Sequence, residues 1–217
     1  MKPHDGARRD RARQAFIDIH AGHGPTDDEA LDLVLGLHRA HVEDRFTLVG
    51  LVMTHGHHRL EAGDIPYSVI RDLYRMLELR LQTPLLDLGC GYGRIGFYGA
   101  LLWNQPLHGI EIVPERVAEA RRVQQELGCA SLRFEVGDLL TASWPEVSCY
   151  LMLNSIFPSL MAPVVARLRK IAEARKITIA SISSSNEVLR AESWLEERVP
   201  DCPSAALPVS LRLFTSG

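Results

Sequence analysis

Residues 85 to 96, LLDLGCGYGRIG, place an acid and alternating glycines directly after an apolar run. The glycines Gly89, Gly91 and Gly93 let a ligand approach the backbone, and the amides at the start of the following helix face such a ligand. The acid is Asp87. A carboxylate beside the turn disfavours a bound phosphate and favours a ligand that carries a positive charge.

A glycine-rich turn after a strand also occurs in dinucleotide sites, in P-loops and in plain connections. Gly91, Gly93 and Gly96 reproduce the G-x-G-x-x-G spacing of a dinucleotide site, but Asp87 would then lie beside the pyrophosphate. A P-loop is excluded because its phosphate-binding lysine is missing. A plain tight connection in an α/β protein is the structural alternative.

The elements that position this turn alternate from Pro84 onward. Strands are expected at PLLDLGC, LHGIEIV, SLRFEVGDLL, VSCYLMLN, KITIASIS and VSLRLFTS, and helices at RIGFYGALLW, PERVAEARRVQQELG, PSLMAPVVARLRKIAEA and NEVLRAESWLEE. Apolar strands that alternate with helices predict a parallel sheet covered on both faces, which is a doubly wound α/β fold. Such folds bind ligands at the carboxyl ends of their strands.

The chain before the core reads as helical, with one loop. Helical patterns in PTDDEALDLVLGLHRAHVE, where Thr26 and Glu29 have capping-box spacing, and in YSVIRDLYRMLELRL flank the segment THGHHRLEAGDIPY, residues 54 to 67. Glycines, a proline and histidines mark this segment as a loop, and we expect it to fold over a ligand at the glycine turn. The predicted organisation is an N-terminal helical cap, residues 1–63, and a ligand-binding core, residues 64–217.

Composition narrows the class of protein. The chain has 217 residues, of which 46% are hydrophobic and 24% charged, and a net charge of −3. This balance lacks the basic footprint of a dedicated nucleic-acid binder and argues against nucleic acid as a partner. Scattered cysteines, no signal-peptide pattern and no apolar run of membrane-spanning length predict a cytoplasmic protein without a membrane partner.

The glycine turn and three later segments, taken in order, resemble the class I S-adenosylmethionine-dependent methyltransferases. DLGCGYG resembles the first motif of that family, GIEIVPERVAEAR the second-strand motif, EVGDLL the third motif, and LMLNSIFP the fourth-strand position that faces the donor methyl. The resemblance covers roughly residues 64 to 217. It implies a Rossmann-like seven-stranded α/β sheet with S-adenosyl-L-methionine as the cofactor.

The resemblance gives each acid a role. Glu111 would hold the two ribose hydroxyls, which suits a carboxylate because it accepts two hydrogen bonds, and it stands about 24 residues after Asp87. Asp138 would accept the adenine amino group. A solvated strand end and a turn-forming Gly-Asp pair are the alternatives for these two acids. The predicted cofactor-binding set is Asp64, Asp87, Gly89, Cys90, Gly91, Gly93, Glu111, Ile112, Asp138, Leu139 and Asn154.

A narrower resemblance connects the chain to the non-SET lysine methyltransferases that act in telomeric silencing. It rests on GDIPYSVI before the core and LNSIFP after the fourth strand. In that group an acid of a pre-core loop, here Asp64, contacts the methionine amino group, and an asparagine, here Asn154, lies at the active site. The group's second asparagine is Ser155 here, and its basic tail is not matched, so only the cofactor roles are carried over. A helix cap near Pro158 is the alternative for Asn154.

The histidines of the loop are the candidates for proton transfer. An amine acceptor must be deprotonated, so His57 or His58 would act as the base, and Asn154 completes the predicted catalytic set. A zinc site and a plain polar loop are the alternatives, and no metal site is predicted.

The sequence thus predicts a methyltransferase acting on an amine of a small molecule or protein, or on another nitrogen or oxygen nucleophile. NSIF differs from the [DN]PP[YF] motif that marks DNA-adenine and glutamine methyltransferases. The alternative function is a regulatory protein that binds S-adenosylmethionine without catalysis.

Overall fold

A computed structural model of the chain describes residues 3–24, 27–38, 49–50, 53, 65–77, 83–153, 155–156, 158–198 and 211–217. Its helices are α1 (Pro3–Ala21), α2 (Asp28–Leu35), α4 (Tyr67–Met76), α5 (Arg94–Trp103), α6 (Pro114–Leu127), α7 (Pro158–Ala172) and α8 (Ser184–Arg190). Its strands are β1 (Leu85–Leu88), β2 (Leu107–Glu111), β3 (Leu132–Val136), β4 (Cys149–Met152), β5 (Thr178–Ser181), β6 (Leu195–Arg198) and β7 (Arg212–Ser216).

The strands form one seven-stranded sheet in the order β3-β2-β1-β4-β5-β7-β6. The strands β1 to β5 are parallel, and β7 runs antiparallel to β5 and β6. The order reverses between β1 and β4, which is where doubly wound sheets open a crevice for a ligand. The glycine turn follows β1 and therefore lies at this crevice.

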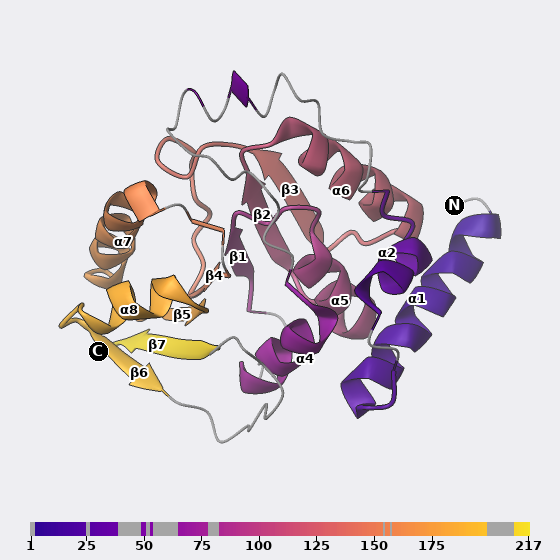
Figure 1. Cartoon of the computed structure of the whole chain (residues 1–217), viewed down its shortest axis with the longest axis horizontal. Coiled ribbons are helices and arrows are strands. Elements are labelled where there is room, and N and C mark those ends of the chain that lie inside the picture. Colours follow the sequence, from indigo (N-terminus) through magenta and orange to yellow (C-terminus); the bar gives the residue numbers. More distant parts are fainter. Residues whose placement is uncertain are drawn as a thin grey trace.

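Helices cover both faces of the sheet, as the alternating pattern predicts. Figure 1 shows α7 and α8 on the left of the strands and α1, α2 and α5 on the right. One buried cluster joins side chains of α1, α2, α4, α5 and α6 to the sheet, and a second joins α7 and α8 to its other face. The N-terminal helices thus share their core with the α5 face.

Side-chain alternation along β1 separates these two faces. Leu85 belongs to the core on the α5 side, whereas Leu86 and Leu88 belong to the core on the α7 side. Successive strand residues point to opposite faces, so Asp87 points to the same face as Leu85. A carboxylate therefore stands among the apolar residues beneath α4 and α5.

Two sequence predictions about the end of the sheet are wrong. NEVLRAESWLEE is not one helix, because α8 ends at Arg190 and β6 follows. The sheet is also not wholly parallel, because β7 is antiparallel to both of its neighbours. Arg190 donates to Glu197 at 2.6 Å, and Arg212 lies 3.0 Å from the same carboxylate, so the partners that hold β6 are set by the tertiary fold.

The start of α2 also differs from the prediction. Asp27 is the N-cap, and its carboxylate accepts hydrogen bonds from the amides of Glu29 and Ala30. Thr26, the predicted cap, lies outside the described residues. An aspartate satisfies the free amides of a first helical turn as well as a threonine does, so the cap shifts by one residue.

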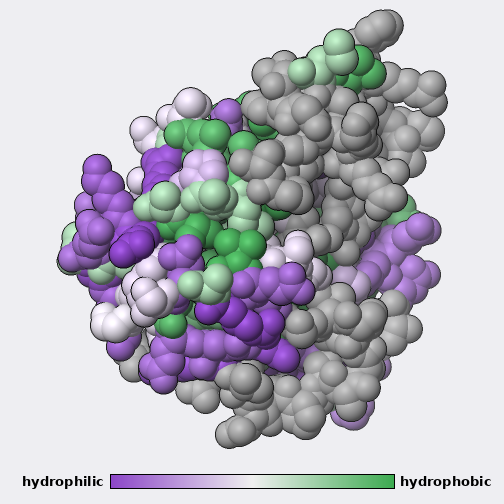
Figure 2. All heavy atoms as spheres, turned by 60° about the vertical axis from the view of Figure 1, so that its left-hand side comes forward, coloured by the Kyte–Doolittle hydropathy of each residue, from purple (hydrophilic) through white to green (hydrophobic). Residues whose placement is uncertain are grey.

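The outer helices on the α7 side are amphipathic. The residues Met161, Val164, Val165 and Leu168 of α7 are buried at helical spacing. Figure 2 shows this side of the molecule, where hydrophilic residues surround a smaller hydrophobic area. None of the helices in the described part of the chain combines the length and apolar character that a bilayer span requires.

Candidate active site

The glycine turn is held against the end of β2 by backbone hydrogen bonds. The amides of Gly89 and Cys90 donate to the carbonyl of Ile110 at 2.8 and 3.1 Å. Gly89, Gly91 and Gly93 have φ values of +90°, +53° and +81°, which is the left-handed region that favours glycine. Three such residues in five positions turn the chain sharply from β1 into α5.

The space around the three glycines differs. A Cβ atom at Gly89 would collide with Ser155, and one at Gly93 would come within 2.6 Å of the Phe134 ring. A Cβ atom at Gly91 would meet no atom of the described residues within 4 Å. Gly89 and Gly93 are therefore required by the packing of the protein itself, whereas Gly91 leaves its backbone open to a ligand.

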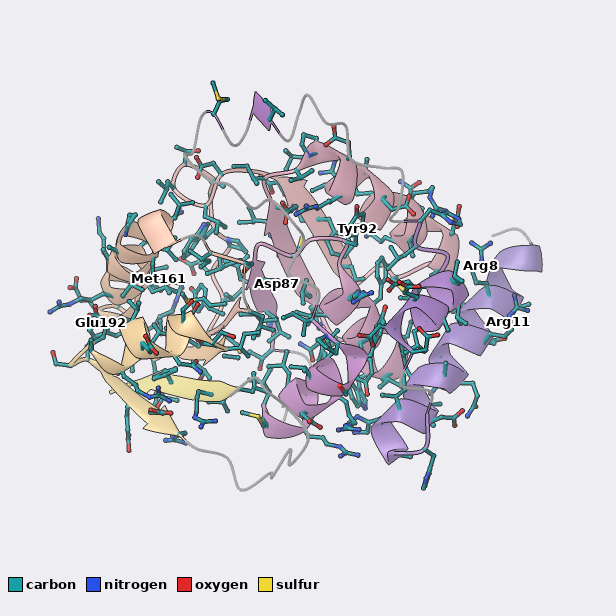
Figure 3. All side chains as sticks on the ribbon, in the orientation of Figure 1. Arg8, Arg11, Asp87, Tyr92, Met161 and Glu192 are labelled. Atoms are coloured by element: carbon teal, nitrogen blue, oxygen red, sulfur yellow. The ribbon has the colours of Figure 1, made fainter. Side chains whose placement is uncertain are left out.

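Asp87 is a buried acid beneath this turn. Its exposed fraction is 1%, and its Oδ2 atom has no hydrogen-bond partner among the described residues. Burial, assisted by the negative charge of Glu111, raises the pKa of Asp87 to about 7. Figure 3 shows Asp87 near the middle of the molecule, with Tyr92 marking the glycine turn above it. The predicted role of Asp87, to face a ligand that carries a positive charge, stays a prediction.

Glu111, at the end of β2, is bonded to the turn. Its carboxylate accepts hydrogen bonds from the amides of Gly91 at 2.9 Å and Val113 at 3.0 Å, and Arg116 lies 3.8 Å away. The residue is 6% exposed, so the solvated strand end considered above does not describe it. Each carboxylate oxygen keeps a second lone pair, so these bonds leave room for the hydroxyls of a ribose. The ribose role stays a prediction.

Asp138 lies in the turn that follows β3. Its Oδ1 atom accepts a hydrogen bond from the amide of Leu140 at 2.8 Å, as a turn-forming aspartate does. The amide of Gly137 donates to the carbonyl of Glu111 at 2.9 Å, which brings this turn beside the end of β2. Asp138 is half-buried. Its predicted contact with adenine is untested.

The remaining predicted neighbours occupy three different environments. Cys90 is buried in the turn, and burial together with the charges of Asp87 and Glu111 raises the pKa of its thiol. Leu139 is buried in the core on the α7 side, and Ile112 is half-buried after β2. The Cys90 side chain therefore acts as a small apolar residue, whereas the Cys90 backbone forms part of the glycine turn.

The predicted catalytic residues His57, His58 and Asn154 lie outside the described residues, as does the cofactor residue Asp64. Their roles stay predictions. The segment after β4 nevertheless reaches the site, because the hydroxyl of Ser155 donates to the carbonyl of Leu88 and packs on Gly89. Ser155 thus braces the glycine turn.

The structure adds a polar group that the sequence analysis missed. The guanidinium of Arg94, directly after the glycine turn, pairs with the carboxylate of Asp32 in α2. The two residues are 62 positions apart, and no spacing rule connects them. One feature of the sequence hints at this ion pair. Asp32 is a charged residue between the apolar residues of α2, at a position that is buried in the structure.

The family follows from comparison with known proteins. Residues 80–196, more than half of the chain, match the model of a family described as a methyltransferase domain. The chain belongs to the class I S-adenosylmethionine-dependent methyltransferases. This membership confirms the predicted family, its Rossmann-like fold and its cofactor, S-adenosylmethionine.

Solved structures of class I methyltransferases share this fold at low identity. An RNA methyltransferase from Salinibacter ruber, in complex with S-adenosyl-L-homocysteine, is 23% identical with a TM-score of 0.52, covering 70% of this chain and 92% of that one. A precorrin-6y C5,15-methyltransferase from Geobacter metallireducens GS-15 is 10% identical with a TM-score of 0.53, covering 75% and 94%. These two proteins are named for different methyl acceptors, so the shared fold does not identify the acceptor of this chain.

A curated methyltransferase is similar over a shorter stretch. The 23S rRNA (uracil(747)-C(5))-methyltransferase RlmC from Shigella boydii is 38% identical over 72 residues, which are 33% of this chain and 18% of that protein. The match thus spans less than a fifth of the relative's length. It agrees with the methyltransferase family and does not define an acceptor.

Proposed function

We propose that this chain binds S-adenosylmethionine where β1 and β2 end and transfers its methyl group to a nitrogen or oxygen nucleophile. The observation that carries the proposal is the pairing of a Gly91 backbone that no described residue crowds with the buried Oδ2 atom of Asp87, which has no hydrogen-bond partner among the described residues. A cofactor that carries an ammonium group and no phosphate fits both features. A dinucleotide, with its pyrophosphate, fits neither.

The residues that would hold the cofactor come from three strand ends. Asp87 would face the ammonium of the methionine part, Glu111 the ribose hydroxyls, and Asp138 the adenine amino group. The turn around Gly91 would lie against the cofactor through its backbone. Asp64, from the predicted loop over the site, would supply a second acid for the ammonium.

The chemistry asked of the protein is mainly positioning. S-adenosylmethionine supplies an electrophilic methyl on a sulfonium, so the acceptor's lone pair forms the new bond while the carbon–sulfur electrons return to sulfur. The protein has to align the acceptor with that methyl and exclude water. It also has to accept a proton from an amine or hydroxyl acceptor, and His57 or His58 is the proposed base.

The acceptor is proposed to react directly, without a covalent enzyme intermediate. The described cysteines Cys90, Cys129 and Cys149 are buried, and burial raises the pKa of each thiol. The thiolate is the nucleophilic form, so none of these three suits attack on a substrate. A small-molecule or protein amine stays the expected acceptor, and relatives named for RNA make RNA an acceptor class that has to be tested as well.

Transfer of a radioactive methyl group tests this proposal. The protein is incubated with S-adenosylmethionine labelled at the methyl and with a cell extract, which is then separated into protein, RNA and small-molecule fractions. Label in the protein or small-molecule fraction supports the expected acceptor, and label in RNA corrects it. Cofactor binding without transfer to any fraction would favour the regulatory alternative, and absence of binding would reject both functions.

A further inference from the structure

A buried polar group joins the N-terminal region to the glycine turn. The carboxylate of Asp32 in α2 accepts hydrogen bonds from Nε of Arg94 at 2.8 Å and from the hydroxyl of Tyr67 at 2.9 Å, and Nη2 of Arg94 pairs with its other oxygen. The Arg94 guanidinium also lies over the Tyr67 ring, 5.1 Å from its centroid. Asp32 and Arg94 are 4% and 7% exposed, and Tyr67 is 1% exposed.

Arg94 occupies a sensitive position in the cofactor site. It is the first residue of α5, directly after Gly93, whose left-handed backbone closes the turn. Gly93 supplies no side-chain cap to the helix. The Arg94 side chain contacts residues outside the turn. It pairs with Asp32, and its Nη1 atom donates to the carbonyl of Ile65 at 3.4 Å. The ion pair therefore anchors the carboxyl end of the turn to α2.

The same helix also holds the start of α4. The amide of Tyr67 donates to the carboxylate of Asp28 at 2.9 Å, whereas Pro66, the N-cap of α4, makes no side-chain cap. Two acids of α2 thus fix the first residues of two core helices. Both acids and Tyr67 precede residue 80, where the match to the methyltransferase family begins.

Because the Asp32–Arg94 pair is buried, it can couple α2 strongly to the glycine turn. Removing one partner of a buried pair takes a counterion from the other charge where little water can replace it, which is more disruptive than loss of a surface pair. The contact between Arg8 of α1 and Glu126 of α6 is such a surface pair, with side chains 39% and 33% exposed. It joins an N-terminal helix to the core away from the turn.

We propose that Asp32 is a positioning residue for the cofactor site, acting through Arg94 on the turn around Gly91 and Gly93. This inference rests on the proposed function. Because coupling between two sites is reciprocal, cofactor binding at the turn also stabilises the docking of α2. The predicted cap and the methyltransferase core are then one binding unit, and a core that begins at residue 64 binds the cofactor less well.

Hydrogen exchange of the full-length protein tests the coupling without any substitution. The amides of α2 are measured with and without S-adenosylhomocysteine, together with those of α8 as a reference helix outside the coupled group. The proposal expects slower exchange in α2 on addition of the compound, beyond any change in α8. Exchange in α2 that does not respond, in a protein that binds the compound, overturns the proposal.

A pair of substitutions tests Asp32 itself. Asp32→Asn keeps the shape and removes the charge, and it is expected to weaken S-adenosylhomocysteine binding at least tenfold in calorimetry on folded protein, well below its melting temperature. The control Glu126→Gln removes the half-exposed carboxylate charge that pairs with Arg8 and with Arg122, and it should bind within twofold of the wild type. Tyr67→Phe should give a smaller loss than Asp32→Asn, because it removes one hydrogen bond and no charge.

The outcomes separate this inference from the proposed function. Wild-type protein that does not bind S-adenosylhomocysteine overturns the proposed function and with it the inference. Wild-type binding together with unchanged affinity in Asp32→Asn overturns only the positioning role. If Asp32→Asn does not fold, the exchange of α2 in the wild type and the affinity of Tyr67→Phe decide the question.

Discussion

Asp87 and Glu111, the acids of two neighbouring parallel strands, differ in their hydrogen bonding. Glu111 accepts hydrogen bonds from the amides of Gly91 and Val113, whereas Oδ2 of Asp87 is buried without a partner among the described residues. The charge of Glu111 adds to the burial that raises the pKa of Asp87. Glu111 thus braces the turn, and we propose that Asp87 pairs with the ammonium of the cofactor.

Cofactor affinity is expected to rise with pH and to depend on Asp87. Its pKa of about 7 in the folded protein lies above the ordinary value of 3.8, so the acid is largely protonated at pH 6. An ammonium group binds the ionised form, so S-adenosylhomocysteine should bind more tightly at about pH 8 than at about pH 6, with release of a proton. Calorimetry in buffers of different ionisation enthalpy measures both the affinity and the number of protons released.

The same shift has the opposite effect on the free protein. A raised pKa means that the contribution of Asp87 to stability is present below pH 3.8 and is lost as the pH rises through about 7. Asp87→Asn should therefore unfold at the same temperature or higher than the wild type at pH 8, while binding the compound weakly at every pH. An Asp87→Asn protein with the wild-type pH profile of binding would remove this acid from the site.

Alanine substitutions should divide the glycines into two groups. Gly91→Ala introduces a Cβ atom that no described residue crowds, so we expect the cost to be the strained backbone, about 1–2 kcal/mol, and the protein should fold. Its cofactor affinity should fall steeply, because the methyl occupies the space left for the ligand. Gly93→Ala also collides with the ring of Phe134 and should lose more stability. Thermal unfolding and a binding titration of both variants check this, and normal affinity in Gly91→Ala would contradict it.

Glu111→Ala should weaken cofactor binding more than Glu115→Ala does. Loss of a charged acceptor from the ribose site should cost about 1.5–3 kcal/mol. The first variant also frees the amides of Gly91 and Val113, so the turn itself loosens. Glu115 lies in the first turn of α6, where a carboxylate stabilises the helix start by about 0.3–1 kcal/mol. Equal affinities in a titration would exclude Glu111 from the ribose role.

The segment 54–67 is expected to respond to the cofactor as a lid does. Most of it lies outside the described residues, so this prediction rests on its histidines, its glycines and Asp64. Hydrogen exchange in the segment should slow when S-adenosylhomocysteine is added, and Asp64→Asn should weaken binding without loss of stability. An unresponsive segment together with normal binding by Asp64→Asn would make it a connector only.

The parts of the fold that could be predicted are those fixed by local pattern. The glycine turn, the helix α6 with Pro114 at its start and Gly128 after its end, and the buried strands are visible in short windows of sequence. β6 was missed because its four residues become a strand through pairing with β7, which begins 14 residues after β6 ends. A window that ends before Arg212 does not contain the partner.

The candidate site also has some features that a local pattern indicates and others that depend on tertiary packing. Asp87 and the glycines are selected from one motif, and Glu111 is selected from its place at the end of the second strand, which the family resemblance singles out. The hydrogen bonds that Glu111 makes, and the pairing of Asp32 with Arg94, depend on how distant elements pack. Neither a motif nor a periodicity carries that information.

The position of β7 between β5 and β6 has a consequence for folding on the ribosome. The strands β1 to β5 find parallel partners among strands already synthesised or next to follow, but β6 touches the described sheet only through β7. β7 is made after β6, so a nascent chain that has extruded β6 still carries it unpaired, with its backbone groups bonded to water. Translation has to reach residues 212–216 before that edge of the sheet can form.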